Sequence, residues 1–144
     1  MSDEIKIGGE LIERPVLPIA NDDGTPCLYP VVIKSYRKKP GRPNDQGEPT
    51  EYYSWCFELI SGSYVGATVY GSTNDEARRS YTTKNPMKLL QLMIAAFGVE
   101  PEKGTTVKLD EIIGKRLRVE LEDKEGGGGE TYQQVSRYYA FKGE

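Results

Sequence analysis

The sequence predicts a mainly β domain with one amphipathic helix, and three observations carry that prediction. Five runs of residues alternate between apolar and polar side chains, which is typical of half-buried strands. One segment, residues 84–98, instead spaces its apolar residues three and four apart, as a helix requires. No repeat or change of composition divides the 144 residues, so one hydrophobic core of ordinary single-domain size is expected.

The first three strands are predicted before this helix. In the run 27–38, CLYPVVIKSYRK, Val31 and Ile33 alternate with polar neighbours and indicate the first strand. Residues 39–50 contain three prolines and two glycines, so they should form a long hairpin loop. The second strand should begin at Glu51 and the third should cover residues 67–73. The core-facing residues of the second strand are predicted to be Tyr53, Trp55, Phe57 and Leu59.

The helix has recognisable start and stop signals. We predict Asn85 as the N-cap, Pro86 as the first helical residue and Gly98 as the stop. One side of this helix should pack on the sheet. That side is predicted to hold Leu89, Leu90, Met93, Ile94 and Phe97.

After the helix, a short helical turn is expected at residues 109–114 and two further strands at 115–123 and 131–141. The fourth strand should bury Leu117, Val119 and Leu121, and the tract 125–130 should join it to the fifth. Three strands, a helix and two strands match the OB fold, a five-stranded Greek-key barrel. We therefore predict an OB-fold domain at residues 27–144, with the helix between strands three and four, preceded by an extended arm at residues 1–26.

The composition argues against catalysis. The chain has no histidine, which removes the commonest general base and most zinc sites. Cys27 and Cys56 are too few to staple a domain and lack a metal-ligand spacing. We expect reduced thiols, no cofactor, no metal and no enzymatic activity. A magnesium-dependent hydrolase, which needs only convergent carboxylates, is kept as an alternative.

Targeting signals are absent from the sequence. No apolar stretch approaches the roughly 20 residues that a membrane-spanning helix needs. The start, MSDEIKIGGE, lacks the basic and then apolar layout of a signal peptide. We therefore expect a cytoplasmic protein with no membrane partner.

Charge is segregated along the chain although its net value is only −3. Residues 34–42, KSYRKKPGR, carry five cations and no acid, whereas residues 1–23 carry six acids and two bases. A basic run of this kind is typical of phosphate contacts.

Five segments also resemble phage-encoded single-stranded DNA-binding proteins of the OB-fold kind. They are FELISGSYVG, ATVYGST, NPMKLLQLMIAAFG, LDEIIGKRLRVELE and ETYQQVSRYYAF, and the resemblance covers roughly residues 27–142. It implies sequence-tolerant binding of DNA during replication or recombination, without cofactor or catalysis. It also implies replication or recombination proteins as partners and the cytoplasm of the host cell as the location.

Sequence-tolerant binding of single strands needs cations along the phosphates and aromatic rings on which bases stack. The basic run supplies the first, and tyrosines on the outward side of strands two and three supply the second. The loop before the helix, with its arginines and Tyr81, is expected to form the opposite wall of the same groove. The predicted binding residues are Lys34, Tyr36, Arg37, Lys38, Lys39, Arg42, Tyr52, Tyr70, Arg78, Arg79, Tyr81 and Lys84.

Four alternatives stay open at this point. The basic run is also found in solvated loops, although its lack of acids favours phosphate contact. Trp55 can serve in the core or as a base-stacking ring, and its phase along the strand favours the core. The acidic N-terminal residues favour a protein–protein interaction module, a phage accessory or host-modulating protein. A free edge strand could pair between subunits and make a homo-oligomer.

Overall fold

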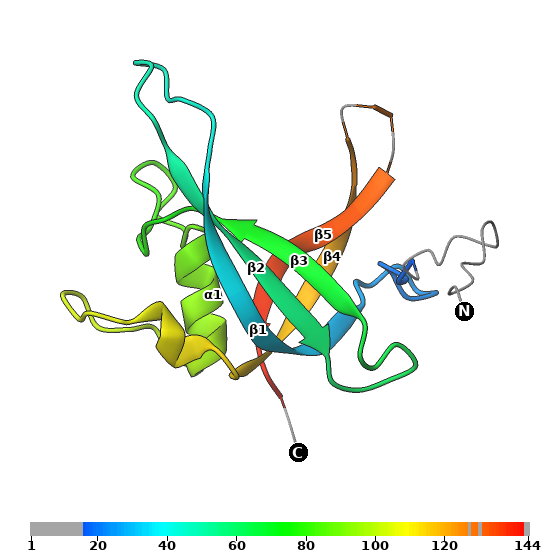
Figure 1. Ribbon diagram of the computed structural model, residues 1–144. Coiled ribbons are helices and arrows are strands. Elements are labelled where there is room, and N and C mark those ends of the chain that lie inside the picture. The colour runs from blue at the N-terminus through cyan, green and yellow to red at the C-terminus, as the bar shows by residue number, and fades with distance from the viewer. Residues whose placement is uncertain (1–15, 127, 130, 143–144) are drawn as a thin grey trace, which may run out of the picture.

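The protein is a mainly β chain with one long helix (Figure 1). The computed structural model describes residues 16–126, 128–129 and 131–142. The predicted order of three strands, helix and two strands is confirmed. The elements are β1 (Leu28–Pro40), β2 (Glu51–Leu59), β3 (Thr68–Thr73), α1 (Lys88–Phe97), the 3-10 helix η1 (Leu109–Ile112), β4 (Arg116–Glu125) and β5 (Thr131–Ala140).

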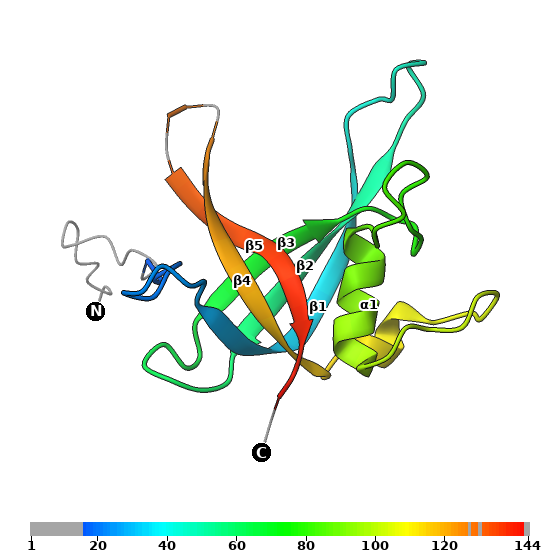
Figure 2. The same cartoon turned by 180° about the vertical axis from the view of Figure 1, so that it is seen from behind.

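All five strands form one antiparallel sheet in the order β3-β2-β1-β4-β5. The sheet curls so that β4 and β5 cross behind β2 and β3 (Figures 1 and 2). The two edge strands then face each other: a Cβ built on Gly71 of β3 would lie 2.6 Å from the Tyr138 hydroxyl of β5. Among the described strands no hydrogen-bonded ladder joins β3 to β5, so the sheet is not closed as a barrel.

The core lies inside this curl, with α1 packed across one end of it (Figure 2). Alternation predicted its strand residues correctly, because Trp55, Phe57, Leu117 and Val119 have no exposed surface. The helix differs from its prediction at Leu92, which is fully buried although it was not assigned to the packed side. Because η1 and the sheet both cover α1, the buried surface of the helix is wider than one stripe.

A one-residue bulge divides β1 into two parts of opposite phase. Ile33 pairs with Phe57 and Ser35 pairs with Cys56, so Lys34 is the extra residue. Side chains alternate along a strand, and an inserted residue reverses which face each later side chain occupies. From Ser35 onward, residues that would have faced the core therefore face outward, and the others inward.

The described chain begins at the opposite side of the sheet from α1, in both views (Figures 1 and 2). There Leu17 is buried in the core cluster. The Gln133 amide binds the Leu17 backbone twice, accepting from its N–H at 3.0 Å and donating to its carbonyl at 2.7 Å. The Tyr29 hydroxyl donates to the carbonyl of Pro18. Part of the predicted arm therefore belongs to the core, and residues 1–15 lie outside the described residues.

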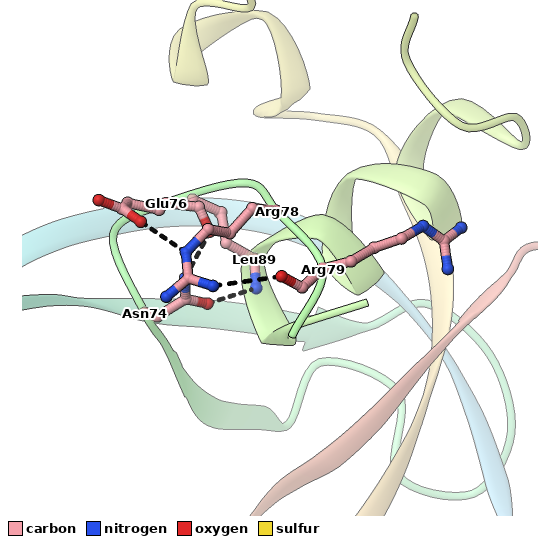
Figure 3. Close-up of polar contacts among 5 residues, drawn as sticks. All are labelled: Asn74, Glu76, Arg78, Arg79 and Leu89. Carbon is pink, nitrogen blue, oxygen red and sulfur yellow. Dashed lines mark hydrogen bonds and ion pairs between the residues drawn. The ribbon is translucent and has the colours of Figure 1, made fainter. Parts of the chain in front are cut away.

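The start of α1 is capped from a distant strand end. The predicted N-cap, Asn85, and the predicted first helical residue, Pro86, are both wrong. The helix begins at Lys88, and the side chain of its N-cap residue, Met87, makes no capping hydrogen bond. Asn74 lies just after β3, and its side-chain amide oxygen, Oδ1, accepts a hydrogen bond from the backbone N–H of Leu89 at 3.1 Å (Figure 3). A side-chain oxygen from outside the helix thus satisfies an N–H of the first turn that has no partner within it. The predicted stop at Gly98 is confirmed, with φ at 78°.

Asn74→Ala is expected to lower the free energy of unfolding by about 1 kcal/mol, the usual effect of losing a helix cap. The loss leaves the Leu89 N–H unpaired at the junction of β3 and α1. Urea unfolding followed by circular dichroism measures it. Asn85→Ala is the matched control. If it lowered the free energy of unfolding as much as Asn74→Ala or more, Asn85 would be the helix cap, as the sequence predicts.

Candidate nucleic-acid interface

The outward face of β1, β2 and β3 carries a shallow groove of about 330 Å³. We call it the outer groove. Arg37 and Lys39 are its charged residues, and no acid lines it. Its lining residues are Ser35, Tyr36, Arg37, Lys39, Ser54, Trp55, Cys56 and Tyr70.

The sheet register fixes the side chains of the outer groove relative to one another. Lys39 pairs with Tyr52, and two residues further along β2 Arg37 pairs with Ser54. Cys56 comes two residues later and pairs with Tyr70 on β3. Tyr70, which is 38% exposed, therefore lies across the sheet from the basic part of β1. The arrangement can offer cations to phosphates and a ring to a base on one surface.

Tyr36 is among the lining residues, but its ring does not share this face, and neither does the Lys38 side chain. This corrects the expectation that Tyr36 stacks on bases beside the basic run. The bulge at Lys34 turns Tyr36 toward the core, where its ring lies 5.2 Å from that of Trp55. The Tyr36 hydroxyl donates to Asp110 at 3.1 Å. Desolvation, reinforced by this carboxylate, raises the Tyr36 pKa. Lys38 lies 5.7 Å from the centre of the Tyr53 ring and 3.8 Å from Glu51.

Three further predicted residues lie on β1, on β2 or in the loop between them without lining the outer groove. Lys34 is exposed at the bulge, and Tyr52 is half-buried opposite Lys39. Arg42 is exposed in the loop between β1 and β2, where its carbonyl accepts the Thr50 hydroxyl. These positions place additional cations and a ring along the path of the β1–β2 hairpin.

The loop before α1 does not form the opposite wall of this groove, contrary to prediction. Arg78 and Arg79 line a second hollow of about 780 Å³, which we call the helix-side cavity, and it shares no lining residue with the outer groove. Arg78 is paired with Glu76 at 2.7 Å and lies 4.4 Å from the Tyr81 ring centre. Figure 3 shows Arg78 against Glu76, with Arg79 directed away from that pair.

Arg79 and Lys84 belong to the same turn. Arg79 pairs with Glu100 at 2.5 Å and also donates to the Lys84 carbonyl at 3.0 Å. Lys84 itself is exposed and has φ at 63°. Of the predicted cations, Arg37 and Lys39 therefore line one hollow, and Arg78 and Arg79 line the other.

Side chains that the sequence prediction missed complete both hollows. Ser35, Ser54 and Cys56 line the outer groove, and Tyr53 lines the helix-side cavity. The two cysteines are free thiols. Within the described residues, no group of three or more His, Cys, Asp or Glu comes together as a metal site. No described helix is long and apolar enough to span a membrane.

Comparison with known proteins assigns no function to these surfaces. No protein-family model matches the chain, and no curated protein matches it. What the protein binds is therefore inferred from the two hollows and the residues that line them.

Proposed function

We propose that this protein binds single-stranded DNA with little sequence preference, and that the outer groove is its principal contact surface. The supporting observation is the lining of that groove: Arg37, Lys39 and the exposed Tyr70 on one face without an acid. Cations neutralise phosphates regardless of base, and every base has a flat face that can stack on tyrosine. Such a surface selects for single strands, whose bases are free to stack.

We also infer that the curled sheet is an OB-type barrel, a fold described as partly open. The strand order, the helix between β3 and β4, and the close approach of β3 to β5 at Gly71 support this inference. In OB folds the face of strands two and three binds oligonucleotides. The outer groove lies on that face.

The biological setting of the proposal follows from the family resemblance. Segments spread over residues 27–142 resemble phage single-stranded DNA-binding proteins, so DNA is proposed ahead of RNA, and replication or recombination as the process. The proposed action is non-catalytic coating of DNA in the cytoplasm of a host cell. Its partners would then be the enzymes that work on the coated strand.

The proposal predicts that oligothymidine protects one thiol and leaves the other unchanged. Cys56 lines the outer groove, whereas Cys27 lies outside it and donates to Asn21 at 3.3 Å. A bound strand should slow alkylation of Cys56 about tenfold or more, because a ligand in excess of its Kd occupies nearly every site. Cys27 should react at an unchanged rate. Mass spectrometry of the two cysteine peptides measures both rates in the same sample.

Neighbouring lysines provide the charge control for this experiment. Lys39→Gln should weaken binding of a four-nucleotide strand. It should also reduce the steepness of log K plotted against log salt concentration by about 0.7, the value for one phosphate contact with a single strand. Lys38→Gln, which removes the same charge from the opposite face, should leave both quantities unchanged. Unprotected Cys56, or equal effects of the two lysines, would contradict the proposed surface. Absence of any binding to the strand would favour a protein-interaction module.

A further inference from the structure

The helix-side cavity has an apolar lining, and the function proposed for the outer groove gives this lining no role. Its volume of about 780 Å³ is within the range of sites that hold small molecules. Leu89, Leu90 and Met93 come from α1, Val107 comes from the segment before η1, and Leu109 is the first residue of η1. Tyr53 of β2 adds an aromatic wall. Such a lining suits a flat, largely apolar group such as a nucleobase.

Charged residues of both signs surround the opening. The cations are Arg78, Arg79 and Lys103, and the acids are Asp75, Glu100 and Glu102. The Arg79–Glu100 pair is about half exposed at both ends, and exposed pairs of this kind are weak. Arginine binds phosphate through two parallel hydrogen bonds, so a phosphate can replace the Glu100 carboxylate on Arg79.

The two hollows lie on opposite faces of the same β-ribbon. Arg37 and Lys39 line the outer groove, while Lys38 between them is directed to the Tyr53 ring, and Tyr53 lines the helix-side cavity. Beyond Ile33, β1 pairs with no described strand except β2. A strand that leaves the outer groove across this ribbon therefore passes from one hollow to the other.

We propose that the helix-side cavity is a second subsite that takes one nucleotide of the same DNA strand. The base lies on Tyr53 and the aliphatic floor, and its phosphate binds Arg79 in place of Glu100. This inference rests on the proposed function, because the outer groove supplies the first contact. The subsite also gives a role to the cation-rich loop before α1, which does not take part in the outer groove.

The acids at the rim make this subsite weaker than the outer groove. Glu100 competes with the phosphate for Arg79, and Asp75 and Glu102 repel it. The subsite is therefore expected to be filled only by strands long enough to be anchored first, because tethering raises the local concentration of the second nucleotide. A protein segment with apolar side chains is the competing occupant of the same floor.

Methyl NMR on the full chain distinguishes a filled helix-side cavity from an empty one. Met93 lines the cavity and Met87 does not, so among the three ¹³C-labelled methionine methyl groups of the chain these two serve as probe and reference. A strand of about 16 nucleotides should shift the Met93 signal through the ring current of the inserted base, whereas one of about 4 nucleotides should not; these lengths are the extremes of single OB-fold footprints. Met87 should stay unchanged with both.

Two rim variants test the phosphate contact. Arg79→Gln should weaken binding of the longer strand about fivefold, and Glu100→Gln should strengthen it about threefold, values typical of one exposed charge contact. Neither should change binding of the shorter strand. Lys142→Gln, an exposed cation outside both hollows, should weaken the longer strand less than Arg79→Gln.

The outcomes separate this inference from the proposed function. If both strands protect Cys56 but Met93 does not shift and the rim variants have no effect, the nucleotide subsite is wrong while the proposed function stands. If neither strand protects Cys56, the proposed function itself fails. Weaker binding in Glu100→Gln would also overturn the phosphate exchange, since it would show that the carboxylate assists binding.

Discussion

Trp55→Ala is expected to lower the free energy of unfolding by about 3–5 kcal/mol, the range for deleting a large aromatic side chain from a core. Trp55 has no exposed surface and packs against the rings of Tyr36 and Tyr53. Its indole N–H also donates to the buried Thr73 hydroxyl at 2.9 Å. Because domains have only about 5–15 kcal/mol of stability, chemical denaturation should show a large shift of the midpoint.

Tyr70→Ala is the matched contrast on the opposite face of the sheet. Tyr70 is 38% exposed, so its removal should cost far less stability. Loss of one stacking ring should instead weaken binding of a short strand by about 1–3 kcal/mol. If Trp55→Ala left the fold intact and abolished binding, Trp55 would be the stacking residue in place of Tyr70, and its assignment to the core would be wrong.

Much of this arrangement was predictable from alternation alone. Trp55, Phe57 and Leu59 share one phase in β2, and all three are buried. The same holds for Leu117 and Val119 in β4. A period of two is a local property of an extended chain, so a single sequence carries it. Gly98 was predictable for a similar reason, because a helix that ends in the left-handed conformation favours glycine.

The side on which Tyr36 lies was not predictable in the same way. Continuing the phase of Val31 and Ile33 directs Tyr36 outward and Arg37 inward, but the bulge at Lys34 exchanges them. Nothing in the residues KSYRK marks which one is extra, because a bulge depends on the pairing of β1 with β2. One inserted residue therefore decides which cations share a face with Tyr70.

Long-range contacts account for the remaining differences. Asn85 matches the local pattern of an N-cap, yet Asn74 performs that function from the end of β3. The loop before α1 resembles a second basic wall in sequence, but Glu100 binds Arg79 from a segment 21 residues away. Such partners are brought together only by the fold, so spacing along the chain does not reveal them.

Gly71→Ala is expected to destabilise the protein by about 1–3 kcal/mol, as overpacking of a filled core does. The added methyl group would lie 2.6 Å from the Tyr138 hydroxyl oxygen, 3.0 Å from Val135 Cβ and 3.5 Å from Phe57. All three neighbours are buried, so none can move freely into solvent. The clash would separate β3 from β5, the two edges that close the curl of the sheet.

Tyr138→Phe should partly rescue this variant. It removes the nearest clashing atom, the Tyr138 hydroxyl, which is buried and has no hydrogen-bond partner among the described residues. Alone, Tyr138→Phe should stabilise the protein by about 1 kcal/mol, because an unsatisfied buried polar group is removed. Burial also raises the pKa of Tyr138 above its ordinary value of 10.0. The folded state therefore loses stability as the pH rises above 10, and the variant should lose less.

A double-mutant cycle then measures how closely β3 and β5 pack. If Gly71→Ala costs less in the Tyr138→Phe background, the difference is the coupling between the two strands, expected at about 0.5–3 kcal/mol for residues in contact. Val135 Cβ, still 3.0 Å away, should keep the rescue incomplete. Additive effects would show that the edges of the sheet do not touch at Gly71. The OB-type closure, and with it the curvature of the outer groove, would then lack its main support.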